Sequence, residues 1–240
     1  MGCGASKKVP YPRESMQSSI KVSNNEQRNI VSRTPRVKRV VIMGDEKYKD
    51  WTGERATFGM SVGFSGGTSH DPTYRRLGDH TETVDIEYDP NETSYQEMLD
   101  LFWSNHNPTS NCSRQYMSAI FYHSPQQKAL AEASLKAEEA RRGSGSRITT
   151  KITPAKAFYD AENYHQKYLL QKHSYVLEEL DIEPGEELIR SHVAARLNGY
   201  LGGHGTRKDF DNECQDLQLP PHVESYVRGK IKHHPASTKG

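Results

Sequence analysis

A strand, a turn and a capped helix are predicted in direct succession between residues 83 and 103, and this order most constrains the fold. Residues 83–88 alternate apolar with acidic side chains, as a half-buried strand does. Residues 89–91 (Asp-Pro-Asn) then predict a turn, and Ser94 with Glu97 forms a capping box that starts a helix. The chain must therefore combine a sheet with helices that pack on it.

Further elements continue this mixture of strands and helices. In the helix after Ser94, five apolar residues recur at the spacing of one helical face. They are Tyr95, Met98, Leu99, Phe102 and Trp103. Strands are also predicted at 37–43, 117–122 and 148–152, and helices at 125–142, 160–172 and 186–198. After Gly202 the sequence is polar and contains several prolines, which predicts an irregular segment. The order of elements indicates an α+β sandwich.

Length, charge and cysteine content limit the class of protein. The chain has 240 residues, of which 33% are hydrophobic, a low fraction for one compact globule of this size. The formal net charge is +1, so the overall charge gives no reason to expect a nucleic-acid partner. The chain has three cysteines and no apolar run long enough to span a bilayer, which favours a reducing, cytosolic location. No spacing of Cys or His indicates a metal site, and we expect no cofactor.

The amino terminus carries an acylation pattern. Residues 1–6 read Met-Gly-Cys-Gly-Ala-Ser, which matches N-myristoylation of Gly2, and the neighbouring Cys3 is suited to palmitoylation. Residues 1–39 contain nine Lys or Arg and two Glu and lack hydrophobic periodicity, which is typical of a disordered tether. We expect this tether to bind the anionic inner face of a membrane. The alternatives are a chance match and a solvated linker.

Several short motifs occur in one order along the chain. They are Asp71-Pro72-Thr73-Tyr74, Gly78-Asp79-His80-Thr81-Glu82, Tyr88-Asp89-Pro90, Phe102-Trp103-Ser104-Asn105-His106, Gln115-Tyr116-Met117-Ser118-Ala119 and Ala161-Glu162-Asn163-Tyr164-His165-Gln166. In this order they resemble the peptide methionine sulfoxide reductase A family. The resemblance implies a two-layer, plait-like α+β sandwich. It also implies the family's reaction, a thioredoxin-dependent reduction of methionine-S-sulfoxide in proteins to methionine, which repairs proteins after oxidative stress.

The family's nucleophile segment has no counterpart at the matching point. The family places Gly-Cys-Phe-Trp-Gly directly after the strand matched by residues 56–60, whereas this chain passes from Met60 to Ser61. In the family that cysteine starts a helix that links two strands, so we expect the first crossover helix to be missing. Either the flanking strand segments merge, or one of them leaves the sheet. We therefore expect impaired or absent catalysis and a less stable core.

The resemblance assigns roles to three retained side chains. Glu82 matches the family's proton donor, and Tyr74 and Tyr116 match the tyrosines that hydrogen-bond the sulfoxide oxygen. A carboxyl shielded in a partly apolar pocket can donate a proton near neutral pH. Without the resemblance, the two tyrosines would be ascribed to ordinary packing and Glu82 to a solvated strand end.

Two cysteines are further candidates for thiol chemistry. Cys112 precedes Tyr116 on a predicted loop and is a weak substitute for the nucleophile, because it lacks the helix N-terminus that activates the family's thiolate. Cys214, in the polar tail, matches a position where the family can keep a resolving thiol.

Glycines and histidines near these motifs are interpreted structurally. Tight turns, rather than phosphate binding, are predicted at three glycines, because no P-loop lysine follows them. These are Gly63, Gly66 and Gly67. His165 and His204 are interpreted as structural or surface residues.

These observations divide the chain into a lipidated basic tether (1–39), a methionine sulfoxide reductase A-like domain (40–175) and a helical, then irregular, extension (176–240). The expected partners are thioredoxin, proteins that contain methionine sulfoxide, and an anionic membrane surface. One competing interpretation is a catalytically dead module that binds oxidised methionine. Another is a lipidated interaction protein.

Overall fold

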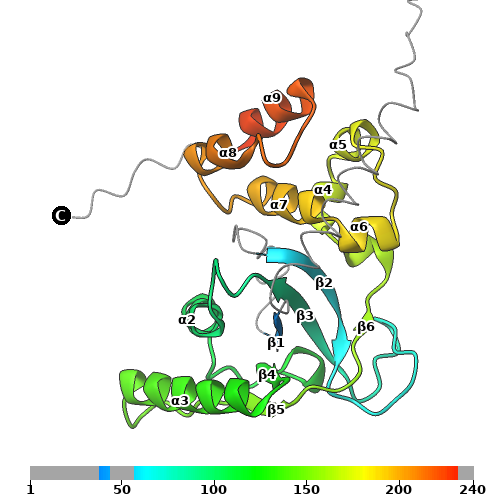
Figure 1. Cartoon of the computed structure of the whole chain (residues 1–240). Coiled ribbons are helices and arrows are strands. Elements are labelled where there is room, and N and C mark those ends of the chain that lie inside the picture. Colours follow the sequence, from blue (N-terminus) through cyan, green and yellow to red (C-terminus); the bar gives the residue numbers. More distant parts are fainter. Residues whose placement is uncertain (1–37, 44–56, 232–240) are drawn as a thin grey trace, which may run out of the picture. The chain divides into compact units, whose positions relative to one another are not determined.

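The computed structural model describes the backbone of residues 38–43 and 57–58 and, with side chains, residues 59–231 (Figure 1). The predicted lipidation sites, Gly2 and Cys3, lie outside the described residues. The described strands and helices are β1 (Lys38–Met43), β2 (Thr57–Ser65), β3 (Thr81–Tyr88), α2 (Tyr95–Asn105), η2 (Arg114–Tyr116), β4 (Ala119–Tyr122), α3 (Pro125–Arg142), β5 (Lys151–Pro154), β6 (Tyr159–Asp160), η3 (Asn163–His165), α4 (Tyr168–Gln171), α5 (Ser174–Glu179), α6 (Glu186–Arg190), α7 (His192–Leu201), α8 (Arg207–Glu213) and α9 (Pro221–Lys230).

The described strands form one mixed sheet in the order β5-β4-β1-β3-β2-β6. Neighbouring strands are antiparallel except β4 and β5, which are parallel because α3 crosses between them. The strand predicted at 83–88 is β3, which lies inside the sheet between β1 and β2. Every residue of β3 except Glu87 is buried. The prediction that one face of this strand is solvated is therefore wrong, because both faces are covered.

β2 continues without interruption through the junction of Met60 and Ser61. It pairs with β3 along its length, with one irregularity next to Gly59. Residues on both sides of this junction belong to the same strand, so neither side leaves the sheet. Side chains alternate between the two faces of a strand, and Met60 and Phe64 join the hydrophobic core on the same face.

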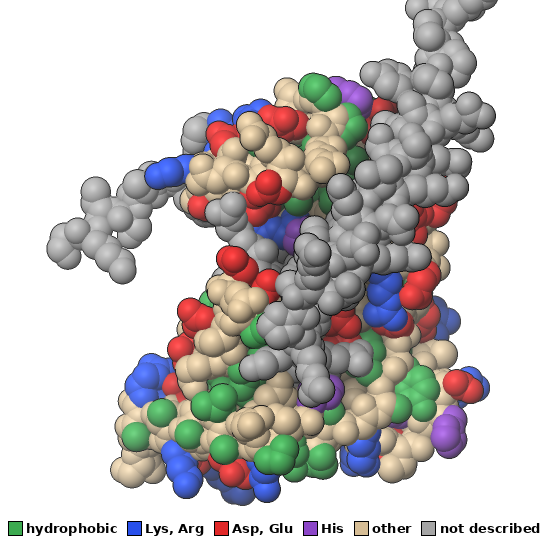
Figure 2. Space-filling view, in the orientation of Figure 1, with side chains coloured by type: hydrophobic (Ala, Val, Ile, Leu, Met, Phe, Trp, Pro, Cys, Tyr) green, Lys and Arg blue, Asp and Glu red, His purple; other side chains and the backbone are tan. Residues whose placement is uncertain are grey.

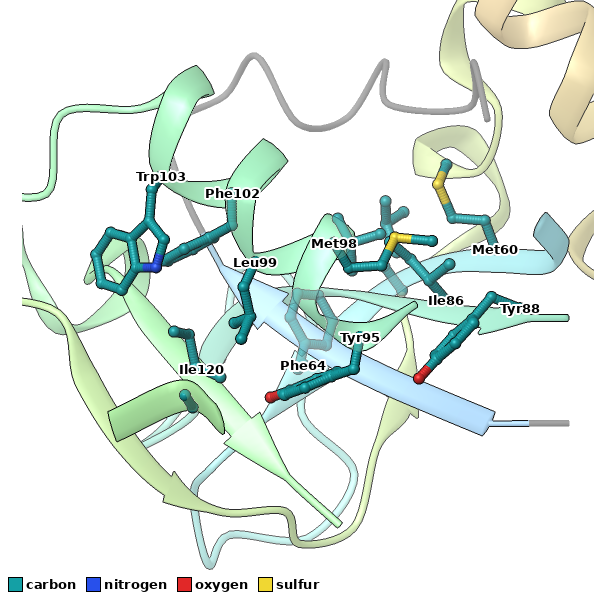
Figure 3. Packing of buried hydrophobic residues seen from close by; sticks show 14 of the residues in the cluster. Met60, Phe64, Ile86, Tyr88, Tyr95, Met98, Leu99, Phe102, Trp103 and Ile120 are labelled. Atoms are coloured by element: carbon teal, nitrogen blue, oxygen red, sulfur yellow. The ribbon is translucent and has the colours of Figure 1, made fainter. Parts of the chain in front are cut away.

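α2 packs its predicted apolar face against the sheet (Figure 3). The capping box is present: the Glu97 N–H donates to Ser94 Oγ, and the Ser94 N–H donates to the Glu97 carboxylate. All five residues of the predicted face are buried. They share one cluster with the strand residues Phe64, Ile86, Tyr88 and Ile120.

α3 joins the same layer and has the predicted ends. The Ser124 hydroxyl caps its first turn, and Gly143, with φ 79°, ends it. Trp103 Nε1 of α2 donates to Ser134 Oγ of α3 at 3.0 Å. Ala131 of α3 is part of the core cluster. The two helices and the sheet thus build an α+β fold.

The chain after β5 differs from the prediction in three places. Instead of one helix, 160–172 contains the end of β6, then η3 and α4, and Lys167 between the last two is left-handed with φ 44°. The helix predicted at 186–198 is divided into α6 and α7 at Ser191, whose hydroxyl caps α7. The segment after Gly202 is not irregular, because it contains α8 and α9.

These later helices enclose a second hydrophobic cluster. Its buried members include Leu170, Val176, Leu188, Leu197, Phe210 and Val223. Arg196 and Glu213 form a buried ion pair within the same group of helices, with 2.7 Å between Nη2 and Oε2. Lys167 attaches the group to β2, since its Nζ donates to the carbonyl oxygens of Met60 and Ile189 at 2.5 and 2.6 Å.

Acidic and basic side chains are interspersed over the described surface of the face shown in Figure 2. Of the helices in the described part of the chain, none is long and apolar enough to cross a membrane. Within residues 57–231, no group of three or more His, Cys, Asp or Glu is placed to hold a metal ion.

Candidate functional site

The loop between β2 and β3 carries Tyr74 and is held in shape by Asp79. The Asp79 carboxylate accepts hydrogen bonds from the backbone and hydroxyl groups of Thr68 and Ser69 at 2.8–3.0 Å. These bonds, first among them the one from the Thr68 N–H, hold the pKa of Asp79 well below its usual range. A carboxylate that stays ionised keeps these four donors in place, so the base of the loop has a defined shape.

Tyr74 and Tyr116 meet at their hydroxyl groups, whose oxygens are 3.3 Å apart. Tyr74 lies in a tight turn closed by pairing of Thr73 with Arg76, and Tyr116 ends η2. Both side chains are half-buried. In such a pair one hydroxyl donates to the other, and the hydrogen of the accepting hydroxyl can point to a third oxygen.

Glu82 is joined to this pair through Gln115. Glu82 stands on β3 opposite Phe64 and has 8% of its surface exposed. Gln115 Nε2 donates to Glu82 Oε1 at 2.8 Å, and Gln115 directly precedes Tyr116. The alternative interpretation of Glu82 as a solvated strand-end carboxylate does not hold.

Two hydrogen bonds fix η2 against the start of β3. Thr81 Oγ1 donates to the Arg114 carbonyl oxygen, and Arg114 Nε donates to the Asp79 carbonyl oxygen, each at 2.7 Å. Tyr116 is therefore positioned by the same strand that carries Glu82. The structure thus brings Tyr74 into contact with Tyr116, 42 positions away, and links Glu82 to Gln115, the residue before Tyr116, across 33 positions.

The two described cysteines are free thiols in different surroundings. Cys112 is exposed on the loop before η2. Cys214 is buried in the second hydrophobic cluster, where its Sγ donates to the Asp211 carbonyl oxygen at 3.5 Å. Burial raises the pKa of Cys214, which disfavours the thiolate. The prediction that Cys214 lies in an irregular polar tail is wrong, because α8 and α9 pack around it.

Gly63 and Gly66 serve different purposes. Gly63 lies inside β2, so the prediction of a turn there is wrong. A Cβ on Gly63 would overlap the Tyr159 carbonyl oxygen and the Phe158 ring, so glycine is required for close approach. Gly66 has φ 83° and forms the predicted turn after the strand.

Three residues around the site were not predicted to contribute to it. They are Gln115, Glu162 and His165. Glu162 Oε1 accepts a hydrogen bond from the Tyr74 N–H at 3.0 Å, and the ring centroids of His165 and Tyr74 are 4.8 Å apart. All three belong to the short motifs that first indicated a family resemblance, so the motifs themselves were the available signal.

Fold and site together define an α+β protein with a buried carboxyl near two paired phenols, and phenol hydroxyls can donate hydrogen bonds to an oxygen atom of a ligand. Comparison with known families is more specific. The family described as peptide methionine sulfoxide reductase matches residues 53–197, more than half of the chain. The family described as the helical domain of selenoprotein methionine sulfoxide reductase A matches residues 184–227. The chain therefore belongs to the peptide methionine sulfoxide reductase A family, as its motifs indicated.

Individual relatives agree with this assignment. The chain is 45% identical over 174 residues to a peptide methionine sulfoxide reductase of Drosophila melanogaster, a match that covers 72% of this chain and 70% of the relative. It is 36% identical over 227 residues to peptide methionine sulfoxide reductase A5 of Arabidopsis thaliana, covering 89% and 84% of the two chains. The fold matches the solved methionine sulfoxide reductase A of Corynebacterium diphtheriae with TM-score 0.52 and 29% identity, over 59% of this chain and 77% of that one.

Proposed function

We propose that Tyr74, Tyr116 and Glu82 bind the sulfoxide group of an oxidised methionine in a protein substrate. The observation that carries this proposal is the 3.3 Å contact between the Tyr74 and Tyr116 hydroxyls, to which Glu82 is linked through Gln115. A sulfoxide oxygen accepts hydrogen bonds, and phenols and a protonated carboxyl are donors. The neutral thioether of methionine offers only a weak acceptor, so the site distinguishes the oxidised from the reduced side chain.

The family's reaction needs a thiolate in addition to these donors. The thiolate attacks the sulfoxide sulfur while an acid protonates the sulfoxide oxygen, the oxygen passes to the enzyme as a cysteine sulfenic acid, and methionine is released. A second thiol then reduces the sulfenic acid through a disulfide, with loss of water. We propose a thioredoxin-type dithiol as the reductant for this step in the family's reaction.

We propose further that this chain carries out the reaction poorly or not at all. Among the described residues, Cys112 is exposed on a loop and Cys214 is buried with a raised pKa, and neither cysteine directly follows β2, where the family places its nucleophile. The unbroken course of β2 through Met60 and Ser61 supports the proposal that the family's nucleophile segment and its crossover helix are missing there.

The purified chain is expected to show no turnover of a methionine-S-sulfoxide peptide with dithiothreitol or thioredoxin, because it lacks a thiolate in the nucleophile's place. Methionine formation, measured by chromatography against a sample without protein, checks this. Turnover clearly above that background would contradict the proposed impairment. Loss of that turnover in Cys112→Ser would then identify the thiol that had replaced the nucleophile.

Binding provides the control that is independent of turnover. The chain should bind the sulfoxide peptide more tightly than the same peptide with unoxidised methionine, as measured by NMR titration. Tyr116→Phe should reduce this preference roughly five- to tenfold, which corresponds to the loss of one hydrogen bond. Equal binding of the two peptides by the wild-type chain would refute sulfoxide recognition.

The amino-terminal sequence supports a proposal about location. We propose that myristoylation of Gly2, with palmitoylation of Cys3, tethers the reductase-like domain to the cytosolic face of a membrane. One acyl chain binds a membrane only marginally, and Cys3, Lys7 and Lys8 provide the second attachment.

In eukaryotic cells the wild-type chain is expected in the membrane fraction, and Gly2→Ala in the soluble fraction, because an alanine at this position cannot be myristoylated. Cys3→Ser should be divided between the two fractions, since one acyl chain and the basic residues remain. Immunoblots of the fractions check this. Retention of Gly2→Ala on membranes at the wild-type level would place the anchor elsewhere.

A further inference from the structure

The segment from Ala161 to Gln166 is fixed to β2 at one residue. The Ala161 N–H donates to the Val62 carbonyl oxygen at 3.0 Å. Gln166 Oε1 accepts from the Val62 N–H at 3.1 Å, and Gln166 Nε2 donates to the Val62 carbonyl oxygen at 2.8 Å. Both ends of this six-residue segment therefore contact the same strand residue, and the position of the residues between them is set by the sheet.

Glu162 reaches from this segment to the loop that carries Tyr74. Its Oε1 accepts from the Tyr74 N–H at 3.0 Å, although the two residues are 88 positions apart. The other carboxylate oxygen, Oε2, lies 3.9 Å from His165 Nε2. One carboxylate thus faces the backbone of Tyr74 on one side and an imidazole on the other.

His165 contacts the side chain of the same tyrosine. The ring centroids of His165 and Tyr74 are 4.8 Å apart, with an angle of 46° between the ring planes. The Tyr164 ring packs against His165 as well, at 4.1 Å. Backbone and ring of Tyr74 are therefore both held from one segment, and the Tyr74 hydroxyl meets that of Tyr116 at 3.3 Å.

We propose that Glu162 and His165 are positioning residues that orient the Tyr74 phenol toward Tyr116 for recognition of a sulfoxide oxygen. This inference rests on the proposed function of Tyr74. Tyr74 lies in a turn rather than in a strand or helix, so the sheet does not fix its direction by itself. Glu162 fixes the backbone from which the phenol projects, and His165 fixes the angle of the ring. A hydrogen bond weakens steeply when its donor is misoriented, so a Tyr74 ring that turns away from this direction contributes less to binding.

The experiment compares variants that keep or remove each contact. Glu162→Ala removes the acceptor for the Tyr74 N–H, whereas Glu162→Gln keeps a carbonyl oxygen there. His165→Ala removes the ring, and His165→Phe keeps one. For each full-length variant, dissociation constants are measured by NMR titration for a methionine-S-sulfoxide peptide and for the same peptide with unoxidised methionine. The readout is the ratio of the two dissociation constants, because a general loss of packing would weaken the binding of both peptides equally.

Glu162→Ala and His165→Ala are expected to lower the preference for the sulfoxide peptide roughly fivefold, comparable to the loss of one hydrogen bond. Glu162→Gln and His165→Phe should stay within about twofold of the wild-type chain. The ring resonances of Tyr74, assigned by comparison with Tyr74→Phe, should shift in Glu162→Ala and return in Glu162→Gln. This second measurement needs no ligand.

Three outcomes overturn the inference, and they separate it from the proposed function. In the first, Tyr74→Phe loses the preference for the sulfoxide peptide but Glu162→Ala keeps it. This result would refute the positioning role of Glu162 and leave sulfoxide recognition intact. If Glu162→Ala weakened the binding of both peptides equally, Glu162 would have a general structural role. A wild-type chain without any preference would refute sulfoxide recognition and, with it, the inference built on it. Thermal unfolding of each variant shows whether the fold is retained.

Discussion

Replacing Phe102 with alanine is expected to lower the free energy of unfolding by about 3 to 5 kcal/mol, the usual cost of removing a buried phenylalanine side chain. Phe102 is 0% exposed and lies between α2 and the sheet (Figure 3). Its ring contacts those of Trp103 and His106, with centroids 4.9 and 4.2 Å apart. Alanine would leave a cavity among these rings. Chemical denaturation followed by circular dichroism measures the effect.

Leu130 provides the matched control, because it is also a large apolar residue in a helix but is 40% exposed. Leu130→Ala should change the free energy of unfolding by no more than about 0.5 kcal/mol. If Phe102→Ala cost less than about 1 kcal/mol, the core around α2 would be loosely packed, and the tight cluster described above would not represent the protein in solution.

Lys167 should make the protein more stable as the pH rises from 7 to 9, by about 2 to 3 kcal/mol. Its side chain is 3% exposed. Burial, and secondly the charge of Arg190, lower the pKa of Lys167 from 10.5 to about 7, while Asp160 opposes the shift. In this range the unfolded chain holds a proton that the folded chain has released. Unfolding then takes up a proton, and its free energy rises by about 1.4 kcal/mol per pH unit. Below pH 7 both states hold the proton and the slope disappears.

The comparison with Lys167→Met isolates this effect, because methionine has a similar length and no titratable group. Denaturation curves at pH 6, 7, 8 and 9 give the free energy of unfolding for both chains. The pKa values of Cys214 and Tyr95 are also raised, which lowers stability at high pH. Both residues are present in both chains, so their effects cancel when the two free energies of unfolding are subtracted. Parallel pH profiles of wild type and Lys167→Met would show that Lys167 does not titrate in this range.

Local signals in the sequence were sufficient where an element is determined by its own residues. The helix α2 has a capping box and a regular apolar face, and α3 has Ser124 at one end and Gly143 at the other. Both helices were predicted nearly to the residue. The prediction failed at 160–172, where bonds to Val62 and a left-handed Lys167 replace helical bonds. Such contacts join residues about 100 positions apart, and periodicity does not report them.

In the candidate site, too, some features could be predicted from local sequence and others depend on contacts between distant residues. Tyr74, Tyr116 and Glu82 were predicted because each stands in a motif that resembles the family. The contact of Tyr74 with Tyr116 and the bond from Gln115 to Glu82 depend on how η2 docks on β3, which the sequence alone does not give. Glu162 was missed because it acts on the backbone of Tyr74, and any residue type has a backbone N–H to donate. The identity of residue 74 therefore does not indicate that its N–H is bonded to a side chain 88 positions away.

The attachment of Gln166 and Lys167 to β2 also affects how one molecule meets another. An exposed strand edge is a template on which a second chain can extend a sheet, and proteins block such edges with charged side chains or covering segments. β6 pairs with β2 at Gly63 and Phe64. Beyond these residues, the Gln166 amide bonds to the N–H and carbonyl groups of Val62, and Lys167 Nζ donates to the carbonyl oxygen of Met60. The segment that orients Tyr74 therefore also blocks intermolecular strand pairing, so that release of this segment exposes an aggregation-prone edge.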